Sequence, residues 1–233
     1  MVTTLTEELV RTWVRGWARS HGYDVHREGN IHAALRSDTT GDWEYILLSP
    51  DQEQLSSVAA TVAENPSRTV MVISPSGQEL DGFSLPEPLR IQASGEKLMV
   101  TDMAQHDVED PLVPEGFEVD TKVMEEQQAI VTVTDAETGE LAARGRVVIE
   151  DGVAVFDRIF TSDNYRRKGL GSFVMRSLAA TALNYDTDTG LLISTPEGLL
   201  LYHYLGWTTL GNVSVLGTDK TVDQHLTHSD DQR

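Results

Sequence analysis

The chain has 233 residues, a length that predicts one or two domains. Its 18 lysine and arginine residues against 37 aspartate and glutamate residues give a net charge of −19, so we expect no nucleic-acid or membrane partner. Cysteine is absent, which excludes disulfides, thiolate metal sites and cysteine nucleophiles and favours a cytoplasmic location. No long apolar run predicts a transmembrane helix, and the first residues do not resemble a secretory signal.

The N-terminal half predicts a mixture of helices and short strands. Apolar residues from Leu5 to Trp17 recur at helical spacing, Thr4 and Glu7 have the spacing of a capping box, and Gly22 follows the expected helix end. A second helix is expected at Gln52–Glu64, where Asn65 and Pro66 stop it. Strands are expected at Ile31–Arg36, Trp43–Leu48, Thr69–Ile73, Leu89–Ala93 and Lys97–Thr101. The stretch Asp107–Gly116 has the composition of a linker.

The C-terminal half has clearer signals. Strands are expected at Gln128–Thr134, Ala142–Glu150, Val153–Thr161, Gly190–Ser194 and Trp207–Leu216, with helices at Gly169–Leu183 and from Thr195 to Tyr204. Strict alternation along the third strand places Asp157, Ile159 and Thr161 on one face. We therefore expect an N-terminal α/β lobe at 1–115, a second domain at 116–217 and a flexible tail at 218–233.

A basic, glycine-containing turn between an expected strand and helix is the most informative segment. It reads Tyr-Arg-Arg-Lys-Gly-Leu-Gly-Ser over residues 165–172, within an island where basic residues outnumber acidic ones. Glycines let the backbone approach a ligand, and free amides at a helix start favour an anion. The spacing matches neither the P-loop nor the dinucleotide fingerprint. The pattern predicts a phosphate cradle, with a merely basic surface turn as the alternative.

A second motif, at residues 201–207, supports the interpretation of residues 165–172 as a phosphate cradle. The pattern R-x-x-G-x-G at Arg166, Gly169 and Gly171 resembles motif A of the GNAT superfamily of acyl-CoA N-acyltransferases, and residues 201–207, Leu-Tyr-His-Tyr-Leu-Gly-Trp, resemble its motif B. The resemblance covers about residues 116–216 and implies an α+β fold, a mixed β-sheet with flanking helices. The N-terminal lobe lacks the motif and is either a degenerate repeat of this fold or an unrelated α/β cap.

The resemblance also implies roles for individual residues. The pantetheine arm of acetyl-CoA would lie beside the backbone of Ile159, Phe160 and Thr161. The phosphates would be bound by residues of the cradle: Arg166, Arg167, Lys168, Gly169, Leu170, Gly171 and Ser172. Tyr202 would protonate the leaving thiolate, with a core tyrosine as the alternative.

Asp157 is the candidate general base, because an acceptor amine must lose a proton before it attacks. The alternative role for Asp157 is a salt bridge to Arg144 or Arg146 on the neighbouring strand. We expect an N-acetyltransferase that uses acetyl-CoA and no metal, and acts on a small-molecule or protein amine; a homodimer is left open. The rival functions are a non-catalytic acyl-CoA-binding protein and a different phosphate-binding protein.

Overall fold

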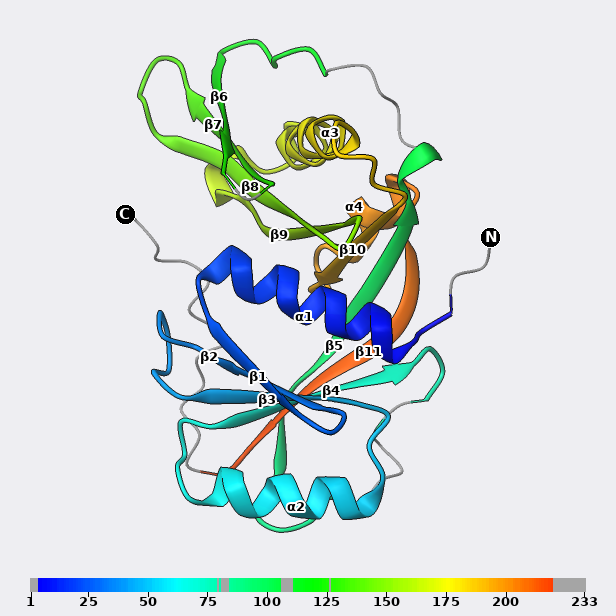
Figure 1. Cartoon of the computed structure of the whole chain (residues 1–233). Helices are drawn as coiled ribbons and strands as arrows, with labels where there is room; N and C mark the ends of the chain where they lie inside the picture. Colours follow the sequence, from blue (N-terminus) through cyan, green and yellow to red (C-terminus); the bar gives the residue numbers. More distant parts are fainter. Residues whose placement is uncertain (1–3, 79, 81–83, 106–110, 126, 220–233) are drawn as a thin grey trace. The chain divides into compact units, whose positions relative to one another are not determined.

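The computed structural model describes residues 4–78, 80, 84–105, 111–125 and 127–219 (Figure 1). The chain divides into two compact units. The first comprises Met1–Val14, His21–Leu98 and Thr209–Arg233, and the second comprises Arg15–Ser20 and Met99–Thr208. This division does not coincide with the expected boundary after residue 115, because one helix and two long strands contribute residues to both units. Most of the expected tail, residues 220–233, lies outside the described residues.

The first unit contains two helices and six paired strands. Its elements are α1 (Glu7–His21), β1 (Asp24–Glu28), β2 (Ile31–Leu35), β3 (Trp43–Leu48), α2 (Gln52–Ala63), β4 (Thr69–Pro75), β5 (Arg90–Asp102) and β11 (Thr208–Gly217). The strand order is β1-β2-β3-β4-β11-β5. Strands β1 to β3 form an antiparallel meander, and β4 pairs in parallel with β3 after α2.

Amphipathic faces explain the two helices. The buried face of α1 carries Val10, Trp13 and Val14 within the first unit, and Gly22 follows with a φ of 72°. The expected capping box at Thr4 and Glu7 is wrong: the helix begins later, and the Thr6 hydroxyl accepts the Leu9 amide at 3.2 Å. Helix α2 lies on one face of the strands β2–β4 and packs its buried side chains into an apolar cluster there (Figure 1).

The second unit contains a sheet of five strands, and the end of β5 pairs with its edge strand β10. Its elements are β6 (Phe117–Met124), β7 (Gln128–Asp135), β8 (Leu141–Glu150), β9 (Val153–Thr161), α3 (Leu170–Leu183), β10 (Thr189–Ser194) and α4 (Leu199–Tyr204), with short 3-10 turns at Met103–Gln105 and Asp163–Tyr165. The order is β5-β10-β9-β8-β7-β6. Strands β6 to β9 are antiparallel, and β10 is parallel to β9.

Helix α3 covers one face of this sheet (Figure 1). It approaches β8 closely at Gly145, where an added Cβ would lie 2.6 Å from both Ile159 Cδ1 and Val174 Cγ1. The glycine therefore permits the helix and the strand to share a dense apolar core that includes Phe156, Leu178 and Trp207.

Both units share one pattern: antiparallel strands, then a helix, then a strand parallel to the last of them. In the first unit the pattern is β1-β2-β3, α2, β4, and in the second it is β7-β8-β9, α3, β10. Of the two interpretations of the N-terminal lobe, this shared topology supports a degenerate repeat.

The expected elements differ from the structure in three respects. The final short helix begins at Leu199 with Gly198 as its N-cap, because Thr195 instead closes a turn by accepting the Gly198 amide. Strand β5 is one strand where two were expected. Strands β1 and β6 were not predicted, since most of their side chains are exposed and give little periodicity.

In the described part of the chain, no helix is long and apolar enough to cross a membrane.

Candidate active site

A β-bulge in β9 distorts the strand that the motif predicted to contact a cosubstrate. Arg144 pairs with Phe160 and Arg146 with Asp157, so Gly145 alone lies opposite Arg158 and Ile159. Arg158 has a φ of 53°, a backbone conformation that is uncommon for a residue with a side chain. Because of the extra residue, side chains after the bulge point to the face opposite the one that unbroken alternation along β9 would give them.

This bulge overturns the expected alternation along β9. Asp157 accepts a hydrogen bond from Ser20 Oγ at the end of α1, whereas Ile159 packs against α3. Thr161 Oγ1 also lies on the α3 side, 3.6 Å from where a Cβ on Gly171 would be. Asp157 and Ile159 therefore lie on opposite faces, and the prediction that they share one is wrong because it assumed an unbroken strand.

Strands β9 and β10 pair along only part of their lengths. The parallel register joins Val153, Ala154 and Val155 to Thr189, Gly190 and Leu191 and ends there. The later part of β9, which contains the bulge and the residues Ile159–Thr161, thus leaves a backbone edge beside β10. An extended chain with amide groups can bind such an edge as an added strand does.

The expected phosphate cradle lies where β9 leads into α3. Gly169 is the N-cap of α3, has a φ of 80°, and makes no side-chain cap hydrogen bond. The first amides of a helix have no intrahelical acceptors, and here no side chain caps them. Gly171 lies in the first turn, where an added Cβ would be 3.1 Å from Leu201 Cδ2 of α4. Together these features leave room and donors for an anion.

The cradle residues differ in what they can offer. Arg166 forms an ion pair with Asp163 at 2.9 Å, and the Lys168 ammonium lies 4.9 Å from the centre of the Tyr165 ring. Arg167 is exposed and has a φ of 60°. Leu170 is buried in the core, so only its backbone can face a ligand. Ser172 is half-buried.

The ring of Tyr202, on α4, lies near the end of β10. The ring packs on Gly198, and a Cβ at that glycine would also lie 3.2 Å from Ser194 Oγ at the end of β10. The side chain is 7% exposed and packs edge-on against Trp207. Among the described residues, its hydroxyl has no hydrogen-bond partner. Burial, together with the charge of Asp157, raises the pKa of Tyr202 well above its usual value, so the phenol stays protonated.

Asp157 is held between α1 and β8. The Ser20 hydroxyl donates to its carboxylate at 2.5 Å, and the side chain of its register partner Arg146 donates to the Ser20 carbonyl oxygen. Its charge acts on both Arg146 and Tyr202. Asp157 is therefore near enough to Tyr202 and to Arg146 for its charge to affect the pKa of each. Sequence reasoning missed Ser20 and the bulge residue Arg158, since neither belongs to a motif.

The first unit has none of these features at the corresponding place in the described chain. Strands β3 and β4 pair from Glu44 to Leu48, and the Ser49 amide continues the pairing by donating to Ile73 O at 2.8 Å. The start of α2 is occupied, because the Asp51 carboxylate accepts the Gln54 amide at 2.8 Å. A closed strand pair and a negatively charged cap leave no place for a phosphate.

A divergent parallel strand pair, an uncapped glycine-containing helix start and a buried phenol stand in the second unit where the two sequence motifs lie. Residues 100–195 match the model of the acetyltransferase (GNAT) family, which confirms the resemblance. A comparison with curated proteins finds no match.

Solved structures support the same fold over most of the chain. A GCN5-related N-acetyltransferase from Kribbella flavida aligns with a TM-score of 0.67 and 14% identity, covering 94% of this chain and 97% of that one. A putative GNAT-family acetyltransferase from Novosphingobium aromaticivorans gives 0.61 and 15%, covering 90% and 96%. A tandem GNAT protein from the clavulanic acid biosynthesis pathway gives 0.54 and 13%, covering 82% and 80%. These similarities confirm the expected GNAT-like α+β fold, and the tandem protein supports an N-terminal lobe.

Proposed function

We propose that the second unit transfers an acetyl group from acetyl-CoA to an amine. The observation that carries the proposal is the presence, in the second unit, of a β9 edge that β10 leaves unpaired, an uncapped start of α3 and a buried phenol. Each matches one part of an acyl-CoA molecule: the pantetheine amides, the pyrophosphate and the thioester sulfur.

The residues around Gly171 fit the diphosphate. The amides from Arg167 to Ser172 would donate to the phosphate oxygens, and the exposed Arg167 would add charge. The backbone of Ile159, Phe160 and Thr161 would pair with the pantetheine arm. Acetyl-CoA supplies an activated thioester: a C–N bond forms, the C–S bond breaks, and CoA thiol and the amide product leave.

Tyr202 and Asp157 would handle the protons. The phenol of Tyr202 would donate to the sulfur as the C–S bond breaks; since its raised pKa exceeds the ~8.5 of a thiol, hydrogen bonding to the developing thiolate is favoured over early transfer. The carboxylate of Asp157, fixed by Ser20, would hold the acceptor amine and take its proton. No group of metal-ligating side chains is found in the described chain, and no step proposed here calls for one.

Thiol release with a panel of amines tests the proposal. The wild-type protein should release CoA thiol with at least one amine, and Gly171→Asp should abolish release because it places a carboxylate in the cradle. Arg176→Gln is the matched control, since Arg176 is an exposed basic residue on α3 outside the site. Saturable CoA binding without thiol release for any amine would instead support the non-catalytic, acyl-CoA-binding alternative.

A further inference from the structure

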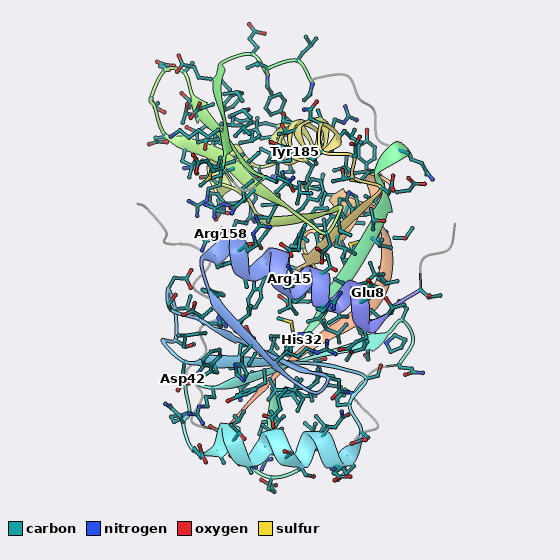
Figure 2. All side chains as sticks on the ribbon, in the orientation of Figure 1. Glu8, Arg15, His32, Asp42, Arg158 and Tyr185 are labelled. Atoms are coloured by element: carbon teal, nitrogen blue, oxygen red, sulfur yellow. The ribbon has the colours of Figure 1, made fainter. Side chains whose placement is uncertain are left out.

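The sheet of the second unit ends at β6, and no strand of the described chain pairs with the outer edge of β6. The strand is formed along its whole length, because each residue from Phe117 to Met124 has a register partner on β7. Phe117 and Val119 pack into the core under α3, on the face that also holds Tyr185 (Figure 2). Alternate residues of an edge strand direct their N–H and C=O groups away from the sheet, so β6 presents a row of donors and acceptors to a further strand.

The side chains of β6 leave this edge uncovered. Every residue from Asp120 to Met124 is exposed, and Val123 is an apolar side chain that is 58% exposed. Asp120 and Lys122 lie on the face opposite α3, since they alternate with the core-facing Val119. The Asp120 carboxylate and the Lys122 ammonium are 3.9 Å apart in an exposed ion pair, which can exchange partners at little cost.

Antiparallel pairing of two copies of β6 matches their charges in one register. Residues directly opposite each other in an antiparallel pair have their side chains on the same face, so a symmetric pair must be centred on a residue that faces its own copy. With Thr121 at the centre, Asp120 lies opposite Lys122 of the partner subunit. In the same register, Val119 lies opposite Val123 of the partner subunit. Opposite charges thus meet on one face, and the exposed valine gains an apolar neighbour on the other.

The other registers that pair more than half of β6 oppose like charges. Centring the pair on Asp120 or on Lys122 would place that side chain against its own copy. Centring it on Val119 would place Glu118 against Asp120. Charged side chains on an edge strand commonly prevent pairing, but an acid and a base two residues apart instead select the register centred on Thr121.

The edge strand of the first unit, β1, provides a contrast. Its residues are all exposed, and in the described chain it pairs only with β2. Pairing of β1 with its own copy over its full length would place Asp24 opposite Glu28, which are both acidic. The charge pattern that permits pairing of two copies along the whole strand therefore belongs to β6 and is not shared by the exposed edge at β1.

We propose that two copies of the chain associate through β6, as an antiparallel strand pair centred on Thr121 that continues the sheet of one second unit into the other. The symmetry closes the assembly as a dimer, because each copy contributes the same single edge. An interface based on one strand pair is small, so we expect a dissociation constant in the micromolar range. The net charge of −19 per chain opposes association, and salt screens this long-range repulsion. The inference does not depend on the proposed acetyl transfer.

Sedimentation of the full chain over a range of concentrations tests the association. Measured at about 0.15 M salt from about 1 to about 300 μM, the wild-type protein should pass from monomer to dimer and no further. A protein that remains monomeric throughout would overturn the proposal. Growth beyond a dimer would also overturn it, because the symmetric pairing leaves no further β6 edge free.

Charge reversal tests whether the dimer forms through β6. Lys122→Glu should raise the dissociation constant at least tenfold, because a carboxylate would then face Asp120 of the partner subunit, and Asp120→Lys should do the same by opposing two ammonium groups. Combining Asp120→Lys with Lys122→Asp exchanges the charges, so this double variant should return to within about threefold of wild type. Arg176→Glu is the matched control, since it changes the net charge as Lys122→Glu does at an exposed position on α3, and it should stay within about threefold of wild type.

Two results would refute self-pairing of β6 even if the protein is dimeric. The first is an unchanged dissociation constant in Lys122→Glu and Asp120→Lys, each shown to be folded by its melting curve. The second is a folded double variant that dimerises no better than the single variants. Either result would place the interface elsewhere on the chain.

Discussion

Replacing Tyr202 by phenylalanine removes a single hydroxyl from the centre of the candidate site. The ring is 7% exposed and packs against Gly198 and Trp207, so the phenylalanine ring should keep these contacts. Among the described residues, no hydrogen-bond partner of the hydroxyl would be stranded. The free energy of unfolding should therefore change by less than about 1 kcal/mol, because the usual cost of leaving a buried partner unsatisfied does not arise.

The loss should appear in the chemical step. A missing proton or hydrogen-bond donor to the leaving group typically costs about 10²- to 10⁴-fold in rate, and it should lower kcat rather than weaken CoA binding, because the donor acts only as the C–S bond breaks. Steady-state thiol release with an amine that the wild type uses, calorimetry with CoA and a melting curve for each protein give the three readouts. A Tyr202→Phe protein whose kcat is within about threefold of wild type would remove Tyr202 from the mechanism, since that lies well below the loss expected for a general acid.

Four further outcomes follow from the same geometry. Gly169→Ala should cost about 1–2 kcal/mol of stability, seen in denaturant unfolding, because a side chain at a φ of 80° is strained. Gly145→Ala should cost about 1–3 kcal/mol, since its Cβ would lie 2.6 Å from two apolar side chains, and an unchanged melting temperature would contradict that packing. Asp51→Ala should lower stability by about 0.5–2 kcal/mol through loss of the cap of α2, while calorimetry still finds the same number of CoA sites. Because the pKa of Tyr202 is raised, its contribution to stability is complete below about pH 10 and lost above it, so Tyr202→Phe should keep more of its melting temperature at pH 11 than wild type does.

The sequence was most informative where periodicity and motif agreed. The helix expected at Gly169–Leu183 is α3 at Leu170–Leu183, and the glycine pattern lies between β9 and α3, as expected. The short helix that carries Tyr202 was also expected from the sequence, and its Leu201 lies beside Gly171. These features depend on local residue patterns, which is why the sequence could indicate them.

The bulge could not be predicted, and it changes the chemistry of the site. Alternation assumes that each residue of a strand has one partner, but Gly145 lies opposite two. Only the register of β8 against β9 reveals that Asp157 faces α1 while Ile159 faces α3. Likewise, the contact of Ser20 with Asp157 joins residues far apart in the chain, and no local pattern encodes it.

The interpretation of the first unit as a degenerate repeat also depends on the structure. The sequence showed only that Ser49, Pro50 and Asp51 stand where a cradle would be. Pairing of β3 with β4 along five residues and the occupied cap of α2 supply the physical reason why this unit should not bind CoA. A composition argument alone could not separate a repeat from an unrelated cap.

Calorimetric titration of the full chain with acetyl-CoA tests the central claim most directly. The account predicts saturable binding at one site per chain that weakens as salt increases, because the ligand is polyanionic. Gly171→Asp should abolish this binding, and Arg176→Gln should retain it. Two sites per chain, no binding by the wild type, or unchanged affinity in a folded Gly171→Asp protein would contradict the assignment of the acyl-CoA site to the junction of β9 and α3.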